Sequence, residues 1–205
     1  MVNRLEVPEL TGPMSDPSSW LAWLAHAFSD TPNRFRHMRS VWRRAVHVRR
    51  SGPEWLTAEM ADRLELAALL HDVGRALDPL NTEPHGFVGA RLLDQVGLGD
   101  VAPLVAHHSG AQLEAAARGM SHLDQWPCLE PDLLAVLTLL DRTTSPSGEQ
   151  VSLEQRRLDM IARHGPHSLH VRLFHATMPE VRHAQRLLHH ADDSPTEADN
   201  VASTN

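Results

Sequence analysis

Apolar residues recur every three or four positions along most of this chain, a spacing that predicts amphipathic helices. Met60, Leu64, Ala67 and Ala68, for example, share a helical face that leads to His71. Helices are expected at about 17–28, 32–50, 58–73, 84–96, 101–108, 111–117, 131–142, 153–163, 167–176 and 179–191. The pattern therefore predicts an all-α fold.

Residues typical of helix ends mark several of these boundaries. Side chains that cap helix N-termini precede four of the helices: Asp16, Thr31, Thr57 and Ser152, the last forming a capping box with Gln155. Glycines that stop helices follow three of them: Gly52, Gly74 and Gly97. The helix limits are thus set by local chemistry as well as by the apolar pattern.

The expected helices belong to one domain, residues 16–191, since no internal repeat separates them. Residues 1–15 contain prolines and a glycine and are expected to form an irregular lead-in. The tail 192–205 lacks apolar anchors and is expected to be disordered. No stretch of about 18 apolar residues and no signal-peptide pattern is found, so we expect a cytoplasmic protein with no membrane contact.

Composition limits the chemistry that this helical domain can perform. The 19 basic residues are all arginine, and the chain has no tyrosine and one cysteine, Cys128, against 15 histidines and a net charge of −7. Without lysine there is no Schiff base and no P-loop, and one cysteine cannot build a cysteine-rich zinc site. Any metal must therefore be held by imidazole and carboxylate, and any phosphate contacted by arginine, backbone amides or hydroxyls.

Two aspartates are placed where an ordinary helix avoids them. Asp72 follows His71 in the expected last turn of a helix, where the helix dipole disfavours an anion by about 0.3–1 kcal/mol. Asp141 shares an apolar face with Leu134 and Leu137. Both positions call for a cation, which is either a bound metal or, in the simpler interpretation, an arginine.

Three further histidine positions lie on expected helices. His37 is on an apolar stripe, His85 starts a helix, and His107 and His108 end another, with His107 the favoured member of that pair. Each alone is more often a structural or exposed histidine than a ligand. Their order in the chain, taken together with that of the two aspartates, is more informative than any one of them.

The series His37, His71-Asp72, His85, His107 and Asp141 resembles the H…HD…H…H…D pattern of HD-domain metal-dependent phosphohydrolases. The surrounding segments RFRHMRSVWRRA, AALLHDVGR, HGFVGARLL, VAHHSG and LTLLDR are similar too, over about 33–145. The chain looks most like HDIG-type bacterial enzymes, which include dinucleoside tetraphosphate hydrolases. It departs from those hydrolases at Pro146, which comes one position late and has no arginine close after it.

The resemblance implies a helical bundle around one or two divalent transition metals, with Fe, Mn, Co, Ni and Zn all compatible with mixed N/O ligands. His37, His71, Asp72 and Asp141 would hold the first metal; Asp72, His85 and His107 would hold the second. Metal-activated water would then attack a phosphoester or phosphoanhydride of a nucleotide, dinucleotide or other phosphorylated small molecule. Asp72 and Arg75 would be catalytic, and Arg75 and Arg142 would bind substrate.

Other functions stay open at this point. A regulatory nucleotide-binding module would keep the fold without turnover, and some HD-fold proteins use a diiron site to activate oxygen. Nucleic acid is disfavoured, since the arginines between residues 34 and 50 spread around their helix and the chain is acidic. A homo-oligomer is compatible with the sequence. The histidines beyond residue 160 are expected to be mostly surface residues.

Overall fold

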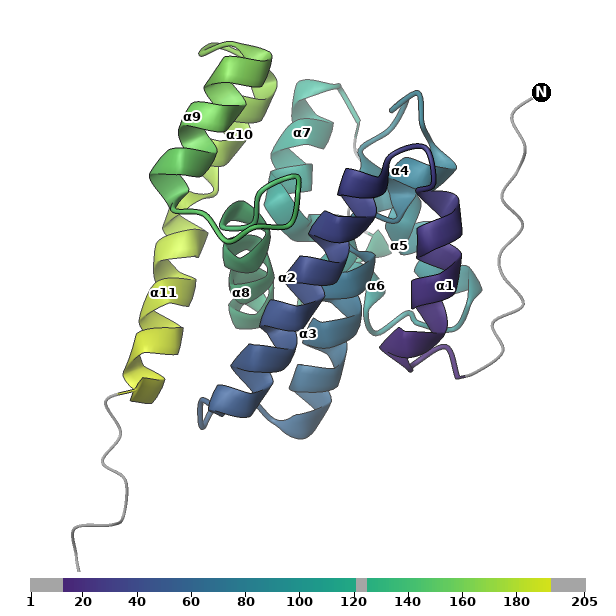
Figure 1. Ribbon diagram of the computed structural model, residues 1–205, viewed down its shortest axis with the longest axis vertical. Helices are drawn as coiled ribbons and strands as arrows, with labels where there is room; N and C mark the ends of the chain where they lie inside the picture. The colour runs from purple at the N-terminus through teal and green to yellow at the C-terminus, as the bar shows by residue number, and fades with distance from the viewer. Residues whose placement is uncertain (1–12, 121–124, 193–205) are drawn as a thin grey trace, which may run out of the picture.

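The helices predicted from the apolar pattern are present in the fold, together with a short helix at Gly74–Leu77 that was not predicted (Figure 1). A computed structural model of the chain describes residues 13–120 and 125–192. Its helices are α1 (Pro17–Ala27), α2 (Pro32–Ser51), α3 (Ala58–Leu70), α4 (Gly74–Leu77), α5 (His85–Gln95), α6 (Ala102–His107), the short 3₁₀ helix η1 (His108–Gly110), α7 (Ala111–Ala117), α8 (Pro131–Arg142), α9 (Leu153–His164), α10 (Leu169–Ala176) and α11 (Met178–Asp192). The all-α prediction is confirmed: within these described ranges the only β pairing is one bridge, Thr144 to Gln150.

The expected caps explain where these helices begin. The Asp16 side chain accepts a hydrogen bond from the Ser18 amide (2.9 Å), and Thr57 accepts one from Met60 (3.2 Å). Ser152 and Gln155 cap each other reciprocally at the start of α9. Thr31 makes no side-chain cap, so α2 begins at Pro32 with the fixed backbone angle of proline alone. Most of the expected lead-in and nearly all of the expected tail lie outside the described residues.

The main difference from the sequence prediction lies at Gly74. We expected this glycine to end the helix that begins after Thr57, but α3 ends at Leu70 and Gly74 begins α4. Its role is close packing: a Cβ there would lie 2.0 Å from the His85 carbonyl oxygen and 2.7 Å from the Gly89 amide nitrogen. Glycine therefore lets α4 approach the start of α5, which brings His85 next to Asp72.

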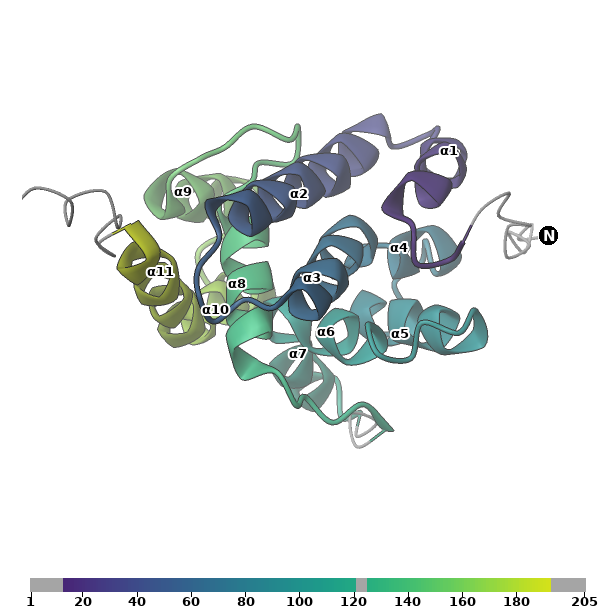
Figure 2. The same ribbon diagram turned by 90° about the horizontal axis from the view of Figure 1, so that it is seen from below.

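The helices form a layered bundle with α2, α3 and α8 in its middle. Figures 1 and 2 show α9, α10 and α11 on one side of these three helices and α1, α4 and α5 on the other. α2 packs along α3, and α11 packs along α8. The largest side chains of the core include Trp20, Phe87 and Leu137, all fully buried. A smaller apolar cluster, Met160, Val171 and Phe174, joins α9 to α10.

The loop between α8 and α9 folds back over α2. The Ser40 hydroxyl donates to the Gly148 carbonyl oxygen, and a Cβ at Gly148 would lie 2.8 Å from the Arg36 carbonyl oxygen. Gly148 also has a φ of +91°, which favours glycine. The loop thereby places the backbone of Ser145 beside α2. None of the helices in the described ranges is long and apolar enough to span a bilayer.

We expect Gly74→Ala to lower the free energy of unfolding by about 1–3 kcal/mol, because the added methyl group overlaps backbone atoms that cannot move alone. Alanine is otherwise more favourable than glycine in a helix by about 1 kcal/mol, so a loss of stability must come from packing. Thermal unfolding measures this, at about 2–4 °C per kcal/mol for a chain of this size. Gly99→Ala is the control, since the nearest atom to its Cβ is 3.4 Å away. An unchanged melting temperature for Gly74→Ala would contradict the packing role.

Candidate metal centre

Six buried side chains from separate parts of the chain meet where several helices end. α2 contributes His37, the turn after α3 contributes His71 and Asp72, and the start of α5 contributes His85. η1 contributes His108, and the last turn of α8 contributes Asp141. The most exposed of the six, His85, keeps only 8% of its surface accessible. The fold thus gathers imidazole and carboxylate groups away from bulk water.

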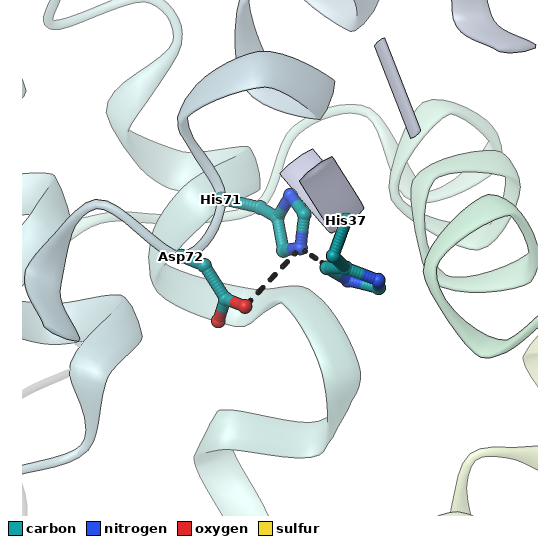
Figure 3. A group of neighbouring side chains, drawn as sticks. All are labelled: His37, His71 and Asp72. Carbon is teal, nitrogen blue, oxygen red and sulfur yellow. Dashed lines mark hydrogen bonds and ion pairs between the residues drawn. The ribbon is translucent and has the colours of Figure 1, made fainter. Parts of the chain in front are cut away.

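The first half of this cluster is built around His37 and His71. Figure 3 shows the His71 ring between His37 and Asp72. His71 Nε2 lies 3.2 Å from His37 Nε2 and 3.7 Å from Asp72 Oδ2. Asp141 Oδ1 lies 3.0 Å from His37 Nε2 and 3.9 Å from His71 Nε2. Four side chains therefore direct ligand atoms at one small volume.

The second half of the cluster shares Asp72 with the first. Asp72 Oδ1 lies 3.1 Å from His85 Nε2, which is itself 3.1 Å from His108 Nε2. One oxygen of Asp72 thus faces His71 and the other faces His85. Within the described residues, two groups have ligand atoms spaced to hold an ion: His37, His71 and Asp72, and Asp72, His85 and His108.

Backbone carbonyls set the orientation of three of the rings. His37 Nδ1 donates to the Ser145 carbonyl oxygen (3.0 Å), His71 Nδ1 to that of Ala68 (2.9 Å) and His108 Nδ1 to that of Val105 (2.6 Å). A carbonyl oxygen can only accept, so each Nδ1 carries a proton. In the neutral ring the inward-facing Nε2 then has a lone pair and no hydrogen.

This protonation pattern provides a test of whether the residues fit a metal. Two Nε2 lone pairs, those of His37 and His71, face each other and the Asp141 carboxylate, and acceptors alone cannot hydrogen-bond to one another. An additional cation, either a second ring proton or a metal ion, is needed among them. Histidines that bind metal commonly donate one ring N–H to a carbonyl oxygen and direct the lone pair of the other nitrogen at the ion. His37 and His71 have this arrangement, so the donor set fits a metal ion.

Burial keeps the imidazoles in the neutral form that a metal requires. Burial lowers the pKa of His71 from 6.5 to about 4, although the Asp72 and Asp141 charges oppose the shift. Burial, followed by the positive charge of Arg75, lowers the pKa of His85 to about 3. Burial also lowers the pKa of His108. Near pH 7 these three rings are available as neutral ligands without displacing a proton.

The two carboxylates stay ionised despite their burial. Burial alone would raise the pKa of Asp72, but the nearby charges of Arg34 and Arg75 hold it well below the usual range. Arg34 Nη1 lies 2.6 Å from Asp72 Oδ2, and Arg75 Nε lies 2.8 Å from Oδ1. Burial would likewise raise the pKa of Asp141, but its contact with His37 and the nearby charge of Arg142 hold it well below the usual range. Both aspartates therefore offer negative charge to a cation.

The structure does not bring His107 to this cluster, and His108 takes the place expected for it. His107 Nε2 donates to the Trp126 carbonyl oxygen (2.6 Å), away from the other histidines. The chain leaves the helical path just after α6, and Ser109 adopts a φ of +54°, which is rare for serine. His108 itself continues the buried stripe of Val101, Leu104 and Val105 at helical spacing, so this spacing could have indicated it in place of His107.

A cleft of about 180 Å³ opens onto this cluster of histidines and aspartates. Asp72, His85, His108 and Asp141 line its floor, and His164 and His170 stack at 4.1 Å between ring centroids along its wall. The guanidinium groups around it come from Arg34, Arg75, Arg142, Arg156 and Arg163. Arg34 and Arg156 were not predicted as site residues. Arg34 is one helical turn before His37, so that spacing could have indicated it.

The substrate-binding residues predicted from the sequence, Arg75 and Arg142, both line this cleft. Arg75 Nη2 lies 3.3 Å from His85 Nε2. Arg142 donates through Nη2 to the Ser109 carbonyl oxygen (3.0 Å), and its guanidinium lies 5.6 Å from the Phe174 ring centroid. Burial lowers the pKa of Arg142, with a further contribution from the charge of Arg156. Arginine side chains thus surround the histidines and aspartates that line the cleft.

Comparison with protein-family models gives one family, HD domain, matched over residues 34–161. That range includes every member of the cluster described above. The comparison with curated proteins and the comparison with solved structures gave no match.

We expect the metal-free protein to lose stability as the pH falls from about 6.5 toward 4. The pKa values of folded His71 and His85 lie below the ordinary 6.5, so the unfolded chain takes up these protons first. The free energy of unfolding that depends on these two neutral rings is fully present above pH 6.5. It is lost as the pH falls toward 4 for His71 and toward 3 for His85. Urea unfolding at several pH values in the presence of EDTA measures it.

His71→Gln removes one of these titrating groups and should therefore flatten the pH dependence of the free energy of unfolding. His183→Gln, at an exposed pair with Asp132, is the matched control and should keep the wild-type slope. Equal slopes for wild type and His71→Gln would show that His71 is not buried in neutral form.

Proposed function

Because this chain belongs to the HD domain family of metal-dependent phosphohydrolases, we propose that it hydrolyses a phosphoester or phosphoanhydride of a nucleotide. The observation that carries the proposal is the pair of buried ligand groups sharing Asp72, beneath a cleft lined by arginines. This arrangement combines sites for divalent metal with groups that bind phosphate.

We assign one metal position to His37, His71, Asp72 and Asp141, and a second to Asp72, His85 and His108. His108 replaces His107 in this assignment because its ring lies in the cluster. The mixed nitrogen and oxygen donors suit Fe, Mn, Co, Ni or Zn. When bound, such an ion lowers the pKa of a water ligand toward neutrality and offsets negative charge on a phosphoryl group.

The residues of the chain contribute positioning and charge. Asp72 directs its two oxygens to different halves of the cluster, so it can link both positions. Asp141 accepts a hydrogen bond from the Ser109 hydroxyl, which restrains its carboxylate. The backbone ties at Nδ1 keep His37, His71 and His108 from rotating, and such restraint on ligands supports metal affinity.

Arg34 and Arg75 are our candidates for contacting the phosphoryl group that is cleaved. Both reach Asp72 from the cleft, and about a third of each side chain is exposed there. A guanidinium has five N–H donors, more than its contact with Asp72 uses, so donors stay available for phosphate oxygens. A planar fork also grips two oxygens of one phosphate at once.

A second hollow supports a nucleotide as the substrate class. It has a volume of about 620 Å³ and shares Arg34, Arg75, Asn81 and Pro146 with the cleft over the metal centre. Its other walls include Phe28, Thr31, Ala76 and Pro79, which combine apolar surface with hydroxyl and backbone groups. Ligand sites commonly have this combination, and a sugar and base could occupy it while phosphate lies at the arginines.

We expect His108→Gln to lower the bound metal content and His107→Gln to leave it at the wild-type level, because only His108 faces the cluster. The loss of a ligand should weaken metal affinity by at least roughly the ten- to hundredfold found for outer-shell changes. Elemental analysis of proteins dialysed against Mn²⁺ measures this directly. The reverse order of the two variants would restore His107 as the ligand.

The proposed hydrolase activity is tested by Asp72→Asn, which removes the shared charge with little change in shape. Turnover of a nucleotide screen by protein loaded with Mn²⁺, Co²⁺, Ni²⁺ or Fe²⁺ should fall by at least roughly two orders of magnitude, as in other losses of charge stabilisation. Asp132→Asn is the matched control, because Asp132 pairs with His183 outside the cleft. A wild-type protein that binds metal yet releases no phosphate or nucleotide in this screen would refute the activity.

A further inference from the structure

Arg142 is buried with no direct ion pair in the described part of the chain, although the charge of Asp141, the residue before it, is near. Only 6% of the residue is exposed, its Nε makes no hydrogen bond, and no carboxylate within the described residues forms an ion pair with it. Its interactions are one hydrogen bond to the Ser109 carbonyl oxygen and a contact with the Phe174 ring. A buried guanidinium with so little compensation is unfavourable unless an anion joins it.

Arg156 on α9 presents a second buried guanidinium to the same cleft. Only 9% of it is exposed, and its Nε also lacks a hydrogen-bond partner. Its one ion pair, to Asp159, is long at 3.3 Å. Asp159 is already held by Arg163 through contacts of 3.0 and 2.6 Å. Arg156 therefore shares its carboxylate partner with Arg163, which makes the shorter contacts.

These two arginines are separate from the pair at the metal centre. Arg34 and Arg75 both form ion pairs with Asp72, and Glu114, another carboxylate of the cleft, pairs with Arg118. Arg142 ends α8 and Arg156 lies in the first turns of α9, whereas Asp72 follows α3. The cleft thus has two cationic regions, and the ion pairs at Asp72, 2.6 and 2.8 Å long, are shorter than the 3.3 Å pair that Arg156 makes.

We infer that Arg142 and Arg156 form a second anion site, which holds a phosphoryl group other than the one at the metal centre. The substrate class is then a phosphoanhydride, a chain of two or more phosphoryl groups, and not a phosphomonoester. This inference rests on the proposed hydrolase function. In the reaction, the oxygen of water bonds to phosphorus, a bridging P–O bond breaks, and the proton of water passes to solvent or to the departing phosphate.

The anion site can be tested without turnover. Calorimetry on metal-free protein compares inorganic tripolyphosphate, which can reach both cationic regions, with orthophosphate. Wild type should bind tripolyphosphate more tightly, and Arg156→Gln should reduce this binding roughly ten- to hundredfold, as expected for charge-assisted hydrogen bonds. Arg157→Gln is the control, since Arg157 pairs with Glu154 on the same helix and does not line the cleft.

Arg156→Lys keeps the charge and should keep part of the preference for tripolyphosphate over orthophosphate. This variant provides a second test in case Arg156→Gln does not fold. Circular dichroism confirms that each variant is folded. A folded Arg156→Gln protein that binds tripolyphosphate as wild type does would overturn the inference, and so would equal affinity of wild type for both anions.

Kinetics with the metal-loaded protein distinguish the two proposals and the source of the phosphate chain. We expect kcat/KM for a nucleoside triphosphate to exceed that for the monophosphate, and Arg156→Gln to lower the former selectively. A greater kcat/KM for inorganic tripolyphosphate than for the triphosphate would identify an inorganic chain as the source. Faster hydrolysis of the monophosphate would overturn the phosphoanhydride class while leaving the hydrolase function standing.

Discussion

The facing nitrogen atoms of His37 and His71 are the constraint on which the site depends. Each ring has its Nδ1 proton bound by a carbonyl oxygen, so two acceptors 3.2 Å apart meet in a buried space beside Asp141. Such an arrangement is stable only with an additional cation. The carbonyls that impose it come from Ser145, in the loop folded over α2, and from Ala68, within α3. The positions of α2, α3 and the loop after α8 therefore decide the chemistry of the cluster.

Charge organises the space above this cluster. Two buried carboxylates lie beneath five guanidinium groups that line one cleft. Arg34 and Arg75 compensate Asp72, which keeps this carboxylate ionised while leaving donors for an anion. Arg142 and Arg156 have no equal compensation. The same low-dielectric setting that makes an unpaired buried charge unfavourable strengthens its attraction for a charged ligand. A site with this balance is suited to a substrate with several negative charges.

Most of the fold could be predicted because local interactions set it. The capping oxygens of Asp16, Thr57 and Ser152 start helices at the expected residues, and apolar spacing predicted the faces that are buried. Gly74 was misassigned because glycine serves two purposes, helix termination and close packing. Only its contact with the backbone of His85 distinguishes them. The short α4 was missed for the same reason, since four residues carry too little periodicity to indicate a helix.

The sequence by itself determined which chemistry was available: without lysine, tyrosine or a second cysteine, imidazole, carboxylate and guanidinium remained. The order of the histidines and aspartates also indicated which of them lie together, with the exception of His107. The choice of His108 over His107 could have been made from helical spacing, because His108 follows the buried residues Val101, Leu104 and Val105 on one face. The tertiary structure alone decided which side chains from distant helices meet. It alone placed Arg156 beside the cleft, since α9 is distant from Asp72 in sequence and reaches it only by packing. Local interactions are encoded by neighbouring residues, whereas side chains meet across the bundle according to how whole helices pack.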